Sequence, residues 1–143
     1  MVQISISCIV AAFNCKNTIV DCIESLAKQD LNDIKHEIIV VNDGSTDGTK
    51  KILNSLDYAN LRVIHLEGNL GVSNARNTAV EASRGKYLAI LDADDIAMDG
   101  RLKKQFTFLE ENPKVGILGS RINSVSEWRS RALLRHSLAV LPS

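Results

Sequence analysis

The sequence predicts an α/β protein in which helices cover both faces of a mainly parallel sheet. Short β-prone runs alternate with helical patterns along the chain, and this rhythm favours right-handed βαβ units. One run, Leu88–Ile96, is apolar enough for a strand buried on both faces. It contains Asp92, Asp94 and Asp95, and such clustered acids cannot be buried unpaired in a core. We therefore expect them at the carboxyl end of a strand, where open α/β sheets bind ligands.

The first half of the chain predicts two strand–helix pairs. Residues 4–11 are β-prone, and a helix with Thr18 as its N-cap is expected over residues 19–26 because apolar side chains recur there at helical spacing. A second strand at 37–41 leads into residues 42–48, whose glycines and capping-type residues predict a tight loop before the next helix. Such a loop can present backbone amides or a carboxylate to a ligand, with an ordinary strand-to-helix turn as the alternative.

The second half continues the alternation. A strand is expected at 61–66, followed by a helix at 72–83 whose small residues would let it lie close to the sheet. Gly85 is expected at the C-cap of that helix. After the acidic strand, helical spacing over residues 102–109 predicts a further helix, and a short strand is expected at 115–118.

The C-terminal segment differs from the rest of the chain. We assign residues 1–120 to one domain and residues 121–143 to a helix and tail, because Arg129, Arg131 and Arg135 alternate there with apolar side chains. A solvated terminal helix is one interpretation. Peripheral contact with a membrane surface and a homodimer contact are the alternatives.

Composition limits the classes of function. The 143 residues carry seventeen basic and seventeen acidic side chains, so net charge gives no reason to expect a nucleic-acid partner. No apolar run approaches the ~18 residues of a membrane span, and the N-terminus lacks a signal-peptide pattern. Three cysteines match neither a disulfide framework nor a metal spacing. We expect a cytoplasmic setting, with the inner face of the membrane as the alternative.

Oxygen ligands such as clustered carboxylates suit Mg²⁺ or Mn²⁺, and these cations suit a phosphate-bearing substrate. A surface turn rich in Asp is the alternative. No GxGxxG follows the first strand and no GxxxxGK[ST] occurs, which disfavours a dinucleotide-binding domain and a P-loop. The first strand ends in Ala11–Asn14 rather than in acids, which disfavours a phospho-acceptor receiver domain.

Five motifs together resemble family 2 glycosyltransferases of the GT-A fold, a Rossmann-like fold. In chain order they are Ile6–Asn14, Val40–Thr49, Gly71–Asn77, Gly85–Tyr87 and Leu91–Asp95. They occur in the family's order and spacing and cover about residues 4–120. Asn42 stands where the family commonly has Asp, and Ala12 and Phe13 stand where Pro and Tyr are common.

The resemblance implies where a nucleotide-diphosphate sugar, with a UDP-sugar favoured, would bind. The backbone of Ala11 and Ala12 would line the nucleoside, and Asp43 would accept a hydrogen bond from the base. The segment Gly71–Asn77, through Arg76, would flank the nucleotide. The remaining substrate-binding positions that the resemblance implies are Asn14, Asn74 and Ala93.

The resemblance also implies a metal site. Asp92 would contact the ribose or a metal-bound water, and Asp94 would coordinate a Mn²⁺ or Mg²⁺ ion bridging the diphosphate. Such an ion neutralises the charge of the departing nucleoside diphosphate. The expected reaction is an inverting transfer of a hexose or related sugar to a hydroxyl of a saccharide or lipid-linked acceptor, as in polysaccharide and cell-envelope biosynthesis.

An inverting transfer also needs a general base for the acceptor hydroxyl. In the family the acceptor region and the base lie well beyond Asp94, so we expect the base beyond Ser143. The alternative is a donor-binding fragment without transferase activity on its own. If these residues do transfer a sugar, Asp95 and Glu127 are the first candidates for the base.

Overall fold

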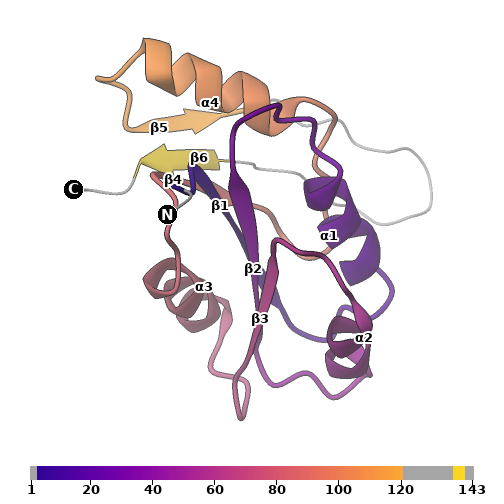
Figure 1. Ribbon diagram of the computed structural model, residues 1–143. Helices are drawn as coiled ribbons and strands as arrows, with labels where there is room; N and C mark the ends of the chain where they lie inside the picture. The colour runs from indigo at the N-terminus through magenta and orange to yellow at the C-terminus, as the bar shows by residue number, and fades with distance from the viewer. Residues whose placement is uncertain (1–2, 121–136, 141–143) are drawn as a thin grey trace.

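The computed structural model describes residues 3–120 and residues 137–140 (Figure 1). Strands and helices alternate along the first 111 residues, as the sequence predicts. The elements are β1 (Ile6–Ala12), α1 (Ile19–Ala27), β2 (His36–Asn42), α2 (Thr49–Ser55), β3 (Leu61–His65), α3 (Val72–Glu81), β4 (Tyr87–Ile90), α4 (Arg101–Glu111), β5 (Ile117–Gly119) and β6 (Ser137–Val140).

The strands form one sheet in the order β3-β2-β1-β4-β6-β5. The pairs β2–β3, β1–β2 and β1–β4 are parallel, whereas β6 is antiparallel to both β4 and β5. The prediction of a mainly parallel sheet is therefore confirmed. Because four neighbouring strands run the same way, their carboxyl ends meet at one edge of the sheet, and the loops that follow them lie close together.

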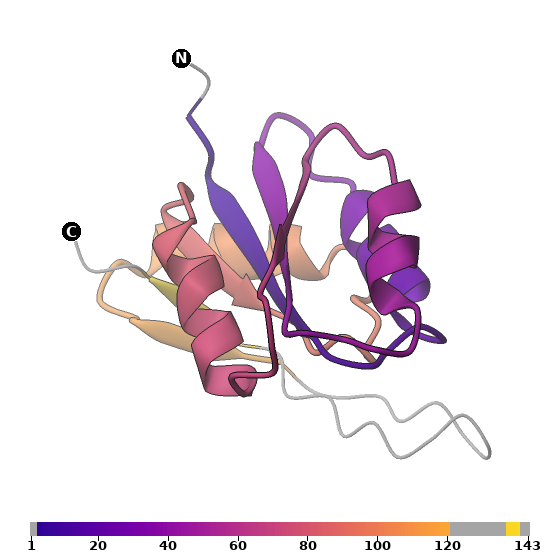
Figure 2. The same cartoon turned by 90° about the horizontal axis from the view of Figure 1, so that it is seen from below.

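Helices cover both faces of the sheet, as predicted. Figures 1 and 2 show α3 on one side and α1 and α2 on the other. The larger core cluster packs α1, α2 and α4 against the face that includes Cys8 and Ile38, and both of these side chains are fully buried. The smaller cluster packs Ala75 and Ala79 of α3 against Ile9 and neighbouring side chains. These two alanines let α3 lie close to the sheet, as its small residues predict.

The acidic strand is shorter than predicted, since β4 ends at Ile90. The Leu91 N–H still donates to the carbonyl oxygen of Ile9 at 3.1 Å. The chain then turns, with the Asp95 N–H donating to the carbonyl oxygen of Asp92 at 3.0 Å. Apolar residues beyond the strand had suggested a longer run, but the turn brings the acids to the edge of the sheet instead.

The prediction of a C-terminal helix is wrong at residues 137–140, which form β6. Tyr87 pairs with Val140 and Ala89 with Leu138, so β6 covers the edge of β4 that β1 leaves free. Pairing this edge satisfies backbone groups that a terminal helix would have left open, which helical spacing could not reveal. The rest of that predicted helix, including Arg129 and Glu127, lies outside the described residues. The strand expected at 115–118 begins later, at Ile117.

Thr18 and Gly85 serve the structure in other ways than the sequence predicts. Thr18 is the N-cap of α1, but its hydroxyl donates to the carbonyl oxygen of Cys15 at 3.3 Å and caps no helix amide. Gly85 does not cap α3, whose C-cap is Ala82. A Cβ at Gly85 would lie 2.5 Å from the backbone nitrogen of Ser7, so glycine is required there by the close approach of two chain segments.

The amino ends of β1 and β2 hold a buried acidic network. Glu37 accepts hydrogen bonds from the Ser7 hydroxyl at 2.7 Å and from the Arg84 N–H at 2.8 Å. The Arg84 guanidinium donates to its other oxygen through Nε at 3.1 Å and Nη2 at 2.8 Å. The Gly85 N–H donates to the Ser7 hydroxyl at 2.8 Å. The network ties the segment before β4 to the start of the sheet.

Within the part of the chain that the structure describes, no helix has the length and apolar character needed to cross a membrane.

Candidate functional site

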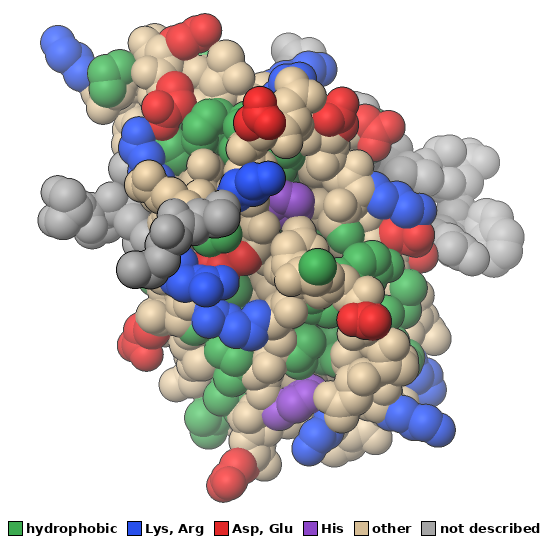
Figure 3. Space-filling model, in the orientation of Figure 1, with side chains coloured by type: hydrophobic (Ala, Val, Ile, Leu, Met, Phe, Trp, Pro, Cys, Tyr) green, Lys and Arg blue, Asp and Glu red, His purple; other side chains and the backbone are tan. Residues whose placement is uncertain are grey.

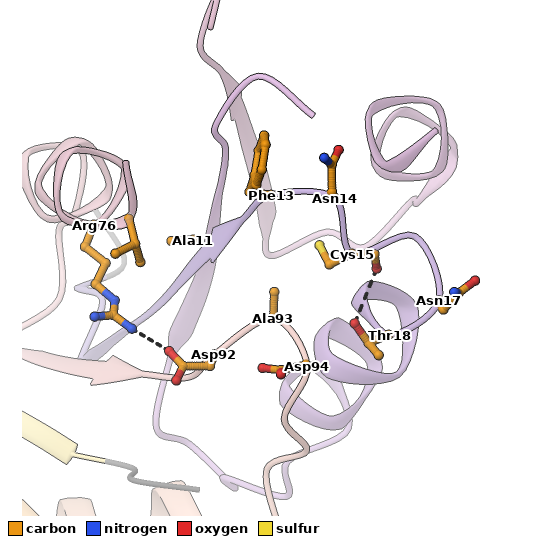
Figure 4. A pocket seen from close by; sticks show the side chains of 11 residues that line it. Ala11, Phe13, Asn14, Cys15, Asn17, Thr18, Arg76, Asp92, Ala93 and Asp94 are labelled. Atoms are coloured by element: carbon orange, nitrogen blue, oxygen red, sulfur yellow. Dashed lines mark hydrogen bonds and ion pairs between the residues drawn. The ribbon is translucent and has the colours of Figure 1, made fainter. Parts of the chain in front are cut away.

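A pocket of about 500 Å³ opens at the carboxyl ends of β1 and β4 (Figure 4). Its wall combines the segment after β1, the start of α1, one side of α3 and the acidic turn after β4. The lining residues are Ala11, Phe13, Asn14, Cys15, Asn17, Thr18, Val72, Arg76, Asp92, Ala93 and Asp94. The ends of two neighbouring parallel strands therefore supply most of the pocket, as expected for an open α/β sheet.

Most of the substrate and metal residues that the resemblance implies lie together in this pocket. They are Ala11, Asn14, Arg76, Asp92, Ala93 and Asp94. Ala12, Asp43 and Asn74 do not line it. Ala12 is fully buried in the core, Asp43 is 2% exposed, and Asn74 is exposed on α3.

The sequence analysis gave no individual role to five of the lining residues. They are Phe13, Cys15, Asn17, Thr18 and Val72. Four of them continue the segment between β1 and α1, so its position directly after a strand was the available signal. Val72 lies one helical turn before Arg76, which was assigned, and helical spacing places the two on one side of α3.

Asp92 is paired with a cation from α3. The Arg76 Nη2 lies 2.5 Å from the Asp92 Oδ1, and both side chains are partly exposed (Figure 4). A partly exposed ion pair contributes little to stability. It does hold Asp92 at a defined place in the pocket and brings one positive charge beside the acids.

Asp94 differs from Asp92 in having no partner among residues 3–120. Its side chain is exposed, and no described residue donates a hydrogen bond to it or forms an ion pair with it. Asp95 does not line the pocket and is 4% exposed. Burial, and then the charges of Asp94 and Asp92, raise the pKa of Asp95 to about 6, although Arg101 opposes this shift. Asp94 is therefore the carboxylate most accessible to a ligand.

The residues fit a cation that is shared with a substrate. Among residues 3–120, no group of three or more His, Cys, Asp or Glu side chains could hold a metal by itself. Mg²⁺ and similar ions are usually bound by one or two carboxylates together with water and substrate phosphates. Asp94 and Asp92 supply such a pair, so a cation here would need a phosphate-bearing partner to complete its coordination.

The loop at residues 42–48 supports the pocket rather than lining it. The backbone N–H groups of Asn14 and Lys16 donate to Ser45 Oγ at 2.9 Å and to Asp47 Oδ2 at 3.1 Å. In return, the Asn14 Oδ1 accepts from the Thr46 N–H at 2.8 Å. These bonds hold Asn14 at a φ of 47°, a left-handed conformation that asparagine tolerates. The loop therefore fixes the shape of the segment between β1 and α1.

Asp43 anchors a second loop. Its two carboxylate oxygens accept from the backbone N–H groups of Leu70 at 2.8 Å and Gly71 at 2.9 Å. Gly71, with a φ of 92°, is the N-cap of α3. Asp43 thereby sets where α3 begins, and so where Arg76 lies. Gly44 approaches this loop so closely that a Cβ would lie 2.5 Å from the carbonyl carbon of Gly68.

Cys15 contributes the thiol of the pocket. Burial raises its pKa, although a hydrogen bond with the Thr49 side chain opposes the shift. A thiol that remains protonated is a poor nucleophile and a poor metal ligand. Cys15 therefore lines the wall as a thiol whose burial disfavours the thiolate.

Charge is mixed over the surface outside the pocket. On the face seen in Figure 3, basic and acidic side chains lie interspersed among polar and apolar ones. This agrees with the balanced net charge of the chain. Binding of an anion would therefore depend on local groups such as Arg76 rather than on a broad positive field.

Comparison with known proteins agrees with the motifs. The family profile described as Glycosyl transferase family 2 matches residues 7–141. The UDP-Glc:alpha-D-GlcNAc-diphosphoundecaprenol beta-1,3-glucosyltransferase WfaP of Escherichia coli is 38% identical over 73% of this chain and 41% of its own length. The putative teichuronic acid biosynthesis glycosyltransferase TuaG of Bacillus subtilis is 38% identical over 74% of this chain and 42% of its own length.

The fold has solved counterparts as well. Residues 1–349 of TarS from S. aureus, in complex with UDP-GlcNAc, superpose with a TM-score of 0.78 at 32% identity, covering 85% of this chain and 35% of that chain. This chain spans about two fifths of the length of WfaP and of TuaG.

Proposed function

Because this chain belongs to glycosyl transferase family 2 and shares the GT-A fold of TarS, we propose that its pocket binds the nucleoside diphosphate of a sugar donor together with Mn²⁺ or Mg²⁺. The observation that carries the proposal is Asp94, an exposed carboxylate without a protein partner among the described residues, beside the Arg76–Asp92 pair. One free and one paired carboxylate, with a nearby guanidinium, suit a metal-bound diphosphate.

Different residues of the pocket would bind different parts of the donor. Asp94 and Asp92 would hold the cation, which supplies electrostatic stabilisation of the leaving diphosphate. Arg76 orients Asp92 and adds a positive charge near the phosphates. Phe13 is 46% exposed and offers an apolar face to the nucleoside, and the backbone of Ala11 lies beside it in the wall.

We propose a UDP-sugar as the donor. TarS was solved with UDP at 33% identity and with UDP-GlcNAc at 32% identity to this chain, and WfaP is named for UDP-Glc. Asp43 would accept a hydrogen bond from the base, as the resemblance implies. Two of its acceptor positions are already used by Leu70 and Gly71, but a carboxylate can accept about four hydrogen bonds.

For the whole protein we propose inverting transfer to a hydroxyl of a saccharide or lipid-linked acceptor. The name of WfaP contains a diphosphoundecaprenol-linked sugar, and TuaG is named for teichuronic acid biosynthesis. An acceptor of this kind would bring the protein to the inner face of a membrane from the cytoplasm. Cell-envelope polysaccharide synthesis is the corresponding process.

A second candidate is donor binding without transfer by these residues alone. Transfer requires a base positioned at the acceptor hydroxyl. In the described part of the chain, the only pocket acids are the two assigned to the cation, and Asp95, which is buried, does not line the pocket. General-base assistance contributes about 10²-fold to 10⁴-fold, so its loss would leave slow hydrolysis of the donor at most.

Calorimetric titration with UDP, GDP and dTDP, each with Mn²⁺ and with chelator, tests the binding proposal. We expect UDP to bind tightest and only with the metal. Equal binding of UDP in chelator would contradict the role of the cation. Release of UDP from a UDP-sugar, measured with and without a saccharide acceptor, separates the two candidates. Acceptor-dependent release by this chain would favour the transferase and make Asp95 and Glu127 the first positions to substitute.

A further inference from the structure

The loop that carries Asp92 and Asp94 is fastened to α1 by side chains outside the pocket. This loop, residues 91–100, joins β4 to α4 and contains two turns but no helix or strand. Ser25 and Gln29 do not line the pocket. Their hydrogen bonds nevertheless end on the backbone of the loop and of the first turn of α4.

Ser25 connects α1 to the middle of the loop through its hydroxyl. The Ser25 Oγ donates to the carbonyl oxygen of Cys22 at 2.7 Å and accepts from the Ala97 N–H at 2.9 Å. Ala97 is buried, with 3% exposed. A buried N–H that loses its acceptor is costly, so the hydroxyl constrains where this part of the loop can lie.

Gln29 joins the loop to the start of α4. Its Nε2 donates to the carbonyl oxygens of Met98 at 3.0 Å and Ser25 at 3.1 Å, and the Ala97 carbonyl oxygen lies farther away, at 3.4 Å. Its Oε1 accepts from the Leu102 N–H at 3.2 Å. The N-cap of α4 is Gly100, which has no side chain to accept from this N–H, and Gln29 does so from the segment directly after α1. Gln29 is 7% exposed, so protein groups determine its orientation.

Cys22 secures the acidic end of the loop. Its thiol lies 3.4 Å from the carbonyl oxygen of Asp92, and burial raises its pKa, so the thiol keeps the proton that it donates. Spacings of three and four residues place Cys22, Ser25 and Gln29 on one side of α1 and its C-terminal end. The loop is therefore attached on both sides of Asp94.

We propose that Ser25 and Gln29 are positioning residues for the acidic site. By holding the loop in the ligand-free protein, they keep Asp92 and Asp94 in the arrangement that binds a cation and a nucleoside diphosphate. The inference rests on the proposed function for its ligand. A loop that is already ordered loses less conformational entropy on binding, so its anchors raise affinity without touching the ligand.

The chain offers matched variants for a test. Ser25→Ala removes the hydroxyl, and Ser25→Thr keeps one. Ser83→Ala is the control, because the Ser83 Oγ donates to the carbonyl oxygen of Val80 at 2.6 Å, three residues earlier as in Ser25, but contacts no part of the loop. Gln29→Met removes the amide at nearly constant volume and serves if Ser25→Ala does not fold.

Two measurements are needed on the folded variants. The first is the dissociation constant of UDP in saturating Mn²⁺, and the second is amide hydrogen exchange at Ala97 and Leu102 without ligand. Loss of one hydrogen bond should raise the dissociation constant about fivefold in Ser25→Ala and in Gln29→Met. Exchange should accelerate about as much, at Ala97 and at Leu102 respectively. Ser25→Thr and Ser83→Ala should stay within about twofold of the unaltered chain.

The outcomes separate the positioning role from the proposed function. Unchanged affinity in folded Ser25→Ala and Gln29→Met overturns the positioning role, since a purely structural contact would lower only the unfolding temperature. If the unaltered chain binds no UDP with Mn²⁺, the proposed function fails. Hydrogen exchange in the two variants then tests the anchoring of the loop without a ligand. Unchanged rates at Ala97 and Leu102 overturn the anchoring, and accelerated rates support it.

Discussion

Glu37 and Asp94 lie at opposite ends of the parallel strands and differ in burial and in hydrogen bonding. At the amino ends, Glu37 has 4% of its side chain exposed and accepts four hydrogen bonds, from Ser7 and Arg84, at 2.7–3.1 Å. At the carboxyl ends, Asp94 is exposed, and no residue in the described ranges pairs with it. An acid with every acceptor satisfied supports the fold, whereas an exposed acid in a pocket is available to a ligand.

Asp43 stands between these two cases. It follows β2 at the carboxyl edge of the sheet, but it is buried and anchors the loop at Leu70 and Gly71. Position at the ligand-binding edge therefore does not by itself make an acid a ligand group. The partners of the carboxylate decide how much of it remains for a substrate.

The largest effect on stability should come from Glu37→Ala. This change leaves the Ser7 hydroxyl and the Arg84 guanidinium without their carboxylate acceptor, and the Arg84 N–H keeps only its longer bond, 3.3 Å, to the Ser7 Oγ. The free energy of unfolding should therefore fall by about 3 kcal/mol in urea denaturation. The affinity for UDP with Mn²⁺ should not change. Glu24→Ala is the control, because Glu24 forms an exposed pair with Lys28 and its loss should have little effect. A weakened nucleotide affinity in folded Glu37→Ala would contradict the assignment of Glu37 to the fold alone.

Asp43→Ala should lower both the free energy of unfolding and the affinity for UDP, because Asp43 anchors the Leu70–Gly71 loop and is assigned to the base. Loss of one charge-assisted hydrogen bond to the base should weaken UDP binding by about 1.5 to 3 kcal/mol in calorimetry. Pyrophosphate, which has no base, should lose less affinity than UDP, because only the anchoring of the Leu70–Gly71 loop is then affected. If pyrophosphate binding falls as much as UDP binding, Asp43 acts on the phosphate site through the Leu70–Gly71 loop, and the assignment to the base is wrong.

Gly85→Ala tests the close packing at the amino end. The added Cβ would lie 2.5 Å from the Ser7 nitrogen, a backbone atom that cannot move alone, so we expect a loss of about 2 kcal/mol in the free energy of unfolding. Gly116→Ala provides the control, since no atom of the described residues beyond its chain neighbours lies within 4 Å of the Cβ it would add. Equal stabilities of the two variants in urea would show that the approach of Gly85 to Ser7 is not tight.

The smallest expected effect is the change with pH of the contribution of Glu37 to stability. Burial acts to raise the pKa of Glu37, but hydrogen bonds from Arg84 and Ser7 outweigh it and lower the pKa below the ordinary 4.5. An acid with a lowered folded-state pKa stabilises the protein above pH 4.5, and this contribution is lost as the pH falls through the lowered value. The stability difference between the unaltered chain and Glu37→Gln should therefore narrow below pH 4.5 in urea titrations. A difference that stays constant would contradict this.

Local patterns predicted the repeating part of the fold. Alternating strand and helix signals placed β1 to α4, because each of these elements buries an apolar face formed by its own residues. The same signals failed at β6, where pairing with β4 depends on a distant edge of the sheet. Gly85 was singled out correctly, but its reason, the approach of Ser7, is a contact between segments far apart in the sequence.

For the site, the sequence predicted which residues come together but not how they pair with one another. Asp92, Asp94 and Arg76 were found from motifs, and the structure brings them into one pocket. Motifs could not reveal that Arg76 pairs with Asp92 rather than with Asp94, because this depends on how α3 crosses the sheet. Nor could they reveal that Asp43 is occupied by backbone amides, since main-chain partners leave no signature in side-chain identity.

Thermal unfolding with UDP, in Mn²⁺ and in chelator, tests most directly whether the acids at the carboxyl edge serve a ligand. UDP at ~100 times its dissociation constant should add roughly 2.7 kcal/mol of stability with Mn²⁺ and nothing in chelator. Asp94→Asn should lose this gain but unfold at the same or a higher temperature without metal, since it removes one of several clustered like charges. Equal stabilisation in chelator, or a clearly lower unfolding temperature of metal-free Asp94→Asn, would contradict the assignment of Asp94 to the metal.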